Sequence, residues 1–102
     1  MGILCCRPTG VPILECIHQL QSVEKTLQLL IHKYDKQILQ ERRTARTKMH
    51  RKSDCLVHMR TIRMIRHHKQ NLEARLESCM NKRYHLESLN VTQMHIRAVR
   101  TT

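Results

Sequence analysis

Residues 13–38 read ILECIHQLQSVEKTLQLLIHKYDKQI, and their apolar positions decide the fold. Ile13, Leu20 and Leu27 recur at a spacing of seven residues. Further apolar residues lie three or four positions from these, and the whole stripe comprises Ile13, Cys16, Ile17, Leu20, Val23, Leu27, Leu30, Ile31, Tyr34 and Ile38. A seven-residue period places these side chains on one face of an α-helix and is typical of helices that pair as coiled coils. The stretch therefore predicts one long amphipathic helix over about residues 12–43.

A second apolar stripe begins near Cys55 and is interrupted more often. Its apolar members are Cys55, Met59, Ile62, Ile65, Leu72, Leu76, Cys79 and Leu86, with Lys69, Arg83 and Asn90 between them. Ser53 and Asp54 precede the stripe, and both residue types cap helix N-termini by accepting bonds from backbone N–H groups. We therefore expect a second, longer helix over about residues 54–99.

The segment 42–52 separates the two stripes and lacks an apolar pattern. It is rich in Arg and Lys and contains no acid, so its charges repel one another, and we expect an open connection with a basic tip over residues 44–53. Two glycines, two prolines and the absence of Phe and Trp argue against β folds. The expected fold is all-α: one domain over residues 12–99, forming a long antiparallel helical hairpin with a coiled-coil-like seam.

The second helix is expected to extend past the first, because it is the longer of the two. Its C-terminal apolar residues are Leu86, Leu89, Met94 and Ile96. The first helix cannot cover all of them, and a small chain without large aromatic side chains gains little from its own core. We expect these residues to contact another surface, most simply a second copy of the protein. The alternative is an adaptor whose apolar stripe docks one partner helix.

The formal charge of +11, from 19 Lys and Arg against 8 acids, indicates an acidic partner. Arg60, Arg63 and Arg66 follow i, i+3, i+6 spacing, which we interpret as a row along one side of the second helix. The cations expected to join them at the tip are Arg42, Arg43, Arg46, Lys48, Arg51 and Lys52. Such a strip suits an anionic membrane surface. The alternatives are nucleic acid, which is usually bound with more stacking aromatics, and a merely solvated face.

Patterns for catalysis and for metal binding are weak. With two glycines the chain cannot form a Gly-rich phosphate loop, and its carboxylates are scattered along the expected helices. His67 and His68 are adjacent, so on a helix they point about 100° apart and are poorly placed to chelate one ion. We expect no enzymatic activity, no metal and no cofactor.

The cysteine pattern, the length of the apolar runs and the N-terminal leader predict a cytoplasmic protein. Five cysteines, an odd number without a C-x-x-C pair, are typical of a reducing compartment, and no apolar run approaches the roughly 20 residues of a spanning helix. The leader, residues 1–11, begins MGILCC and has no secretory signal. Gly2 is the residue type that N-myristoylation requires, and Cys5 and Cys6 can accept palmitate. Cys6 stands where the myristoylation pattern has Ser or Thr, so a lipid anchor and an unmodified tail both stay open.

Short stretches spread along the chain carry a family resemblance. They are Cys16-Ile17-His18-Gln19-Leu20, Glu24 with Leu27, Asp35-Lys36-Gln37-Ile38, Cys55-Leu56, Arg60 through Arg63, and Leu86-Glu87-Ser88-Leu89-Asn90. In this order and spacing the chain resembles the ESCRT-III, or charged multivesicular body, proteins, and in particular the branch that forms the main filament. The resemblance covers about residues 13–97, although each stretch is made of ordinary helix formers.

The resemblance implies a membrane-remodelling protein of endosomal sorting and vesicle-mediated transport, cytoplasmic and peripheral on endosomal or other membranes. Such a subunit polymerises with itself or with full-length relatives. By resemblance, lipid contact falls on Arg60 and Arg63, with Arg66 added by this sequence, and Gly2 matches family members that carry a myristoyl anchor.

Two departures from the family pattern change these expectations. Thr61 and Ile62 stand where the family has a denser basic block. The chain also ends where the family continues into an acidic half that folds back on the hairpin and recruits the recycling ATPase. We therefore expect a subunit that lacks autoinhibition and either alters the filaments of full-length relatives or is inert.

Overall fold

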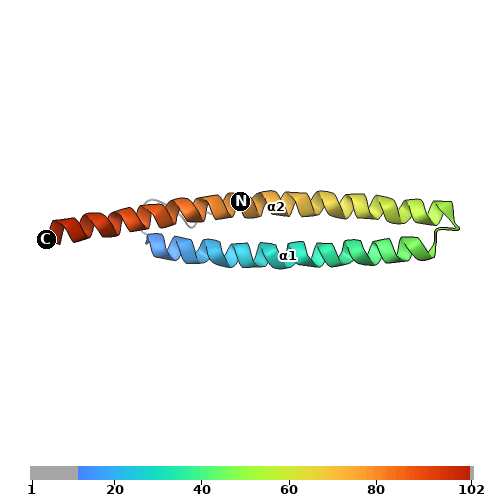
Figure 1. Ribbon diagram of the computed structural model, residues 1–102, viewed down its shortest axis with the longest axis horizontal. Helices are drawn as coiled ribbons and strands as arrows, with labels where there is room; N and C mark the ends of the chain where they lie inside the picture. The colour runs from blue at the N-terminus through green and yellow to red at the C-terminus, as the bar shows by residue number, and fades with distance from the viewer. Residues whose placement is uncertain (1–11, 102) are drawn as a thin grey trace. The chain divides into compact units, whose positions relative to one another are not determined.

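The computed structural model describes residues 12–101 and contains two helices in that range, α1 (Ile13–Thr47) and α2 (Lys52–Thr101). The chain reverses direction between them, at the green end of the ribbon in Figure 1. No strand occurs between residues 12 and 101. The predicted all-α hairpin with a longer second helix is therefore confirmed, since α1 has 35 residues and α2 has 50. The chain divides into two compact units, which are described in turn.

Unit 2 (Leu27–Arg75) contains the turn and the adjoining parts of both helices. Its core is a cluster of buried isoleucines, Ile38 from α1 with Ile62 and Ile65 from α2. Tyr34 is half-buried against this cluster, and its ring stacks on that of His68 with 6.4 Å between the ring centroids. Branched side chains from the two facing stripes thus form the seam that the seven-residue period predicted.

Polar contacts across the seam of unit 2 show the direction of its helices. Asp35 of α1 lies 2.6 Å from Lys69 of α2, and Glu41 of α1 lies 2.6 Å from His58 of α2. The later residue of α1 pairs with the earlier residue of α2, so the two helices are antiparallel.

The helices end closer to the turn than predicted. The first helix was expected to stop near residue 43, but α1 continues to Thr47, and α2 begins at Lys52 instead of residue 54. The connection is therefore residues 48–51, in which the Lys48 N–H donates to the Ala45 carbonyl at 3.1 Å. Ala45 is buried, so the last turn of α1 still contributes to the seam. The helix α1 continues past residue 43 because Arg, Lys and Ala are good helix formers. Repulsion between the exposed positive charges of this segment did not end the helix.

Unit 1 is described over residues 12–26 and 76–101. Its buried apolar residues are Cys16, Ile17 and Leu20 of α1 and Cys79 of α2. Beyond these, residues 91–100 are all exposed. The predicted overhang is thus present within this unit, where the later part of α2 has no cover among the described residues.

The apolar stripes contain more residues than one partner helix covers. Leu30 is 38% exposed and Met59 is 53% exposed, although both were predicted to lie in the seam. A single partner helix buries the narrow line of a and d positions, whereas the stripe on each helix is wider. The flanking apolar residues therefore face outward.

Candidate functional site

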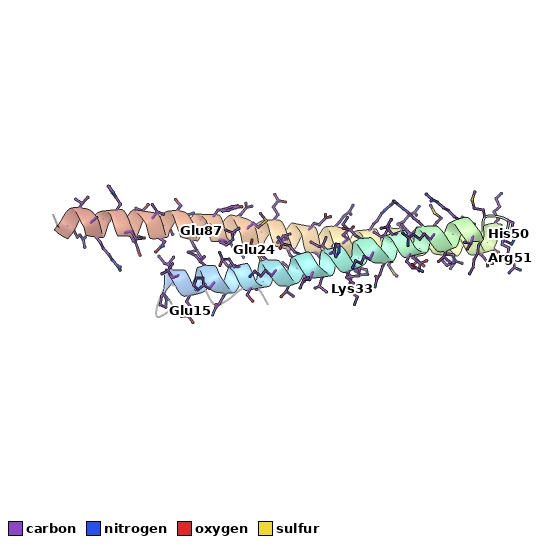
Figure 2. The ribbon with its side chains drawn as sticks, turned by 60° about the horizontal axis from the view of Figure 1, so that its bottom comes forward. Glu15, Glu24, Lys33, His50, Arg51 and Glu87 are labelled. Carbon is purple, nitrogen blue, oxygen red and sulfur yellow. The ribbon has the colours of Figure 1, made fainter. Side chains whose placement is uncertain are left out.

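The most distinctive surface is the group of cations around the turn of unit 2, which we call the basic end. Its members are Arg42, Arg43, Arg46, Lys48, Arg51, Lys52, Arg60, Arg63 and Arg66. Lys48 is half-buried and the others are exposed, so both helices and the turn present positive charge to solvent. Figure 2 labels Arg51 at this end, beside His50.

Acids near the basic end already have partners. Glu41 is half-buried and pairs with His58, with 2.6 Å between the carboxylate and Nδ1. Asp54 lies 3.8 Å from the guanidinium of Arg51, one helical turn away. The remaining cations of the basic end are left in excess, so this surface is strongly positive.

Exposed apolar side chains lie among these cations. Met49 in the turn is 73% exposed, and Leu56, Val57 and Met64 of α2 are each more than half exposed. This feature was not predicted from the sequence, because the apolar period identifies the buried face of a helix and not isolated exposed apolar residues. The available signal was the position of Met49, Val57 and Met64 outside that stripe. A surface that mixes cations with exposed apolar groups is suited to the boundary between lipid headgroups and acyl chains.

Two hollows adjoin the basic end. The larger, of about 450 Å³, is a groove lined from α1 by Ile38, Leu39 and Arg42 and from α2 by Arg66, Lys69 and Glu73. The smaller, of about 230 Å³, is lined by Arg42, Ala45, Arg46, Met49, Cys55 and Met59. Arg42 lines both hollows, so the hairpin register brings two of the predicted cations, Arg42 and Arg66, to the same groove.

Of the three arginines predicted to form a row on α2, one reaches the larger groove. Arg66 lines the larger groove, whereas Arg60 and Arg63 line neither hollow. Three residues of an α-helix fall about 60° short of a full turn, so Arg60 and Arg66 point roughly 120° apart. The three arginines therefore span about a third of the circumference of α2, and their joint action as one strip stays a prediction.

One lysine at the groove is engaged by an acid across the seam. The ammonium of Lys69 lies 2.6 Å from the Asp35 carboxylate. This hydrogen bond is the main reason that the pKa of Lys69 is raised above its ordinary value of 10.5. Lys69 was interpreted as an interruption of the second stripe, and its role became visible only when the register placed Asp35 opposite.

A second polar cluster lies within unit 1. The Arg83 guanidinium donates from Nε to Glu24 Oε2 at 2.6 Å and from a terminal nitrogen to Glu24 Oε1 at 3.1 Å. It also donates to Glu87 at 2.9 Å, and it lies 4.6 Å from the ring centroid of Tyr84. Glu24 is buried, and Figure 2 labels it on α1, with Glu87 labelled on α2. Hydrogen bonding to Glu24 raises the pKa of Arg83, which therefore stays charged inside the seam.

The remaining predicted sites have different outcomes. Leu89, Met94 and Ile96 are exposed and Leu86 is half-buried, whereas Gly2, Cys5 and Cys6 lie outside the described residues. Within residues 12–101, no group of three or more His, Cys, Asp or Glu side chains is arranged to hold a metal ion. No helix in that range combines the length and the apolar character that a bilayer crossing requires.

Comparison with known proteins adds no relative. No protein family, curated protein or solved structure matches the chain.

Proposed function

We propose that this chain is a non-enzymatic, ESCRT-III-like membrane-remodelling subunit, which binds anionic membranes through its basic end and assembles with itself or with related subunits. The observation that carries the proposal is the composition of the basic end. Exposed cations from both helices and the turn stand there beside exposed Met49, Leu56 and Val57, while Glu41 and Asp54 are already paired.

The mixture of charge and apolar surface favours a membrane over nucleic acid. Each well-placed Lys or Arg contributes about 1 kcal/mol of attraction to an anionic leaflet. Exposed methionine and leucine side chains gain further from entering the headgroup region, whereas phosphates of nucleic acid offer them no apolar contact. The described residues contain two tyrosines, Tyr34, which is half-buried, and Tyr84, which is exposed in unit 1, and neither belongs to the basic end.

Exposed apolar residues at the other end of α2 support self-assembly. Leu89, Met94 and Ile96 are 43%, 60% and 44% exposed, and α1 provides them with no cover. A second subunit would bury them, and a membrane surface would concentrate subunits for this contact. The proposed location is accordingly peripheral, on the cytoplasmic side of endosomal or other anionic membranes.

The test is co-sedimentation with phosphatidylserine vesicles, followed by negative-stain electron microscopy of the pellet. Wild type should pellet and form filaments on the vesicles. The triple reversal Arg60→Glu, Arg63→Glu and Arg66→Glu should weaken vesicle affinity by more than about 100-fold, from at least 1 kcal/mol per charge.

The matched control is Lys25→Glu, Lys33→Glu and Lys36→Glu, which makes the same change in net charge on exposed residues of α1 outside the basic end. It should keep most of the binding. If both triple variants lose the same amount of vesicle affinity, binding depends only on net charge, and the idea of a defined basic end is refuted. Binding to DNA or RNA with steep salt dependence, and none to vesicles, would overturn the membrane proposal.

A further inference from the structure

The larger groove of unit 2 has a polarised lining. Its volume of about 450 Å³ lies within the range of roughly 300–1,000 Å³ that is typical of ligand sites. Arg42 comes from α1 and Arg66 from α2, and no acid between residues 12 and 101 forms an ion pair with either of them. Farther along α2, Lys69 is held by Asp35, and Glu73 adds a negative charge. Positive charge without a counter-charge is thus concentrated at the Arg42 and Arg66 end.

Two guanidinium groups on one groove suit a tetrahedral dianion. Each guanidinium can donate two parallel N–H bonds to a phosphate, and a pair of them can engage most of its terminal oxygens. A phosphate monoester carries about −1.5 to −2 charges at pH 7 and three terminal oxygens. A phosphate diester has one charge and only two terminal oxygens, so it can satisfy fewer of these donors.

The acids in the groove restrict the ligand further. Because Asp35 is paired with Lys69, Glu73 is the lining acid that would repel a second phosphate bound next to the first, so the groove suits a single phosphate group. Ile38 and Leu39 line the same groove, and Leu39 is 50% exposed. An apolar lining beside the cations suits an amphiphile whose phosphate lies close to its hydrocarbon part.

We propose that this groove is a binding site for a lipid phosphate monoester of the phosphatidic acid type, held by Arg42 and Arg66. The inference deepens the proposed function and rests on it. Diester lipids such as phosphatidylserine would then be bound through the basic end as a whole, and the monoester through a defined pair of residues.

The experiment compares vesicles that contain phosphatidic acid with vesicles that contain phosphatidylserine, adjusted to the same surface potential. Wild type should bind the phosphatidic acid vesicles about tenfold more tightly, which corresponds to one additional charge-assisted hydrogen bond. The variant Arg42→Gln with Arg66→Gln should bind both vesicle types equally. Circular dichroism would verify that its helical content is unchanged.

The matched control is Arg43→Gln with Arg63→Gln, which removes the same charge from exposed neighbours that do not line the groove. It should weaken binding to both lipids in proportion and keep the tenfold preference. Equal binding of wild type to the two vesicle types would overturn the inference while leaving the proposed function intact. A preference for phosphatidic acid vesicles that persists in the Arg42→Gln, Arg66→Gln double variant would also overturn the inference.

A soluble monoester separates the lipid from a free phosphate source. Glycerol 3-phosphate is titrated into ¹⁵N-labelled protein, and the Arg side-chain signals are followed by NMR. Weak binding together with the vesicle preference supports a lipid ligand. Tight binding without any vesicle preference would assign the groove to a soluble phosphate monoester and overturn the lipid assignment. Failure to bind any vesicle, with no shift of the Arg42 and Arg66 signals, would overturn both proposals.

Discussion

Truncation of Leu20 to Ala is the most direct test of the seam. Leu20 is fully buried, and its side chain is the largest with that property among the described residues. Removing its isobutyl group leaves a cavity in addition to the lost transfer free energy. Leu-to-Ala changes in protein cores cost roughly 2.7–5.0 kcal/mol, and the cost depends on how well the site collapses.

The geometry of unit 1 places the expected cost at the lower end of that range. Its core is a line of contacts between two helices, so neighbouring side chains and water can close the cavity from the sides. Alanine also has a helix propensity a few tenths of a kcal/mol better than that of leucine, which offsets a small part of the loss. We expect Leu20→Ala to lower the free energy of unfolding by about 2–3 kcal/mol.

Urea denaturation followed by circular dichroism at 222 nm measures this loss. With an m value of about 1–3 kcal/mol/M for a small protein, the midpoint should fall by roughly 1–2 M. The matched control is Leu14→Ala, on the same helix and in the same unit, because Leu14 is 55% exposed. Its effect should stay within about 0.5 kcal/mol. Equal shifts for the two variants would refute the placement of Leu20 at the centre of the seam.

Further predictions follow from the ion pairs, the titratable groups and the overhang. Arg83→Met alone should lower Tm by stranding the buried Glu24 carboxylate, and Glu24→Leu alone should lower it less, because Arg83 keeps its bond to Glu87. The double variant should recover most of the loss; additive losses in a double-mutant cycle would contradict the pairing. Burial raises the pKa of the Cys79 thiol above 9.0, and Asp35 raises the pKa of Lys69 above 10.5, so the folded state holds both protons more tightly than the unfolded state. Because the unfolded chain then binds fewer protons at alkaline pH, the contribution of these two groups to stability should be complete below about pH 9 and fall above it. Cys79→Ala should remove the first part of that fall in urea titrations at successive pH values. Finally, Leu89→Gln, Met94→Gln and Ile96→Gln together should abolish filaments in electron micrographs and leave vesicle co-sedimentation intact; filaments of normal appearance would contradict a role in assembly.

The apolar period of residues 13–38 was sufficient to predict the hairpin. Cys16, Ile17, Leu20, Leu27 and Ile38 all belong to the predicted stripe and are buried. Such a regular pattern dominates local preferences, since it places these five residues on one face of a helix. The ends of the helices at the turn were less predictable, because Arg, Lys and Thr are compatible with both helix and loop.

The candidate site was predicted in composition but not in arrangement. The cations of the basic end follow directly from the sequence. Which hollow each cation lines depends on the register, that is, on which residue of α1 faces which residue of α2. The sequence alone does not determine that register. The exposure of Leu56 also required the structure, since Leu56 belongs to an apolar segment whose buried side the sequence alone did not determine.

Three basic residues of α2 pair with acids of α1 within the two units. In unit 1, Arg83 of α2 pairs with Glu24 of α1, and in unit 2 the α2 residues Lys69 and His58 pair with acids of α1. In each pair the acid belongs to α1 and the basic residue to α2, so a slipped register or a parallel arrangement would break these contacts. Pairing within the seam also occupies several of the 8 acids of a chain with 19 Lys and Arg. Cations on the outer surfaces are therefore left with few acids to neutralise them, and the interactions that specify the hairpin also make its basic end available to an anionic partner.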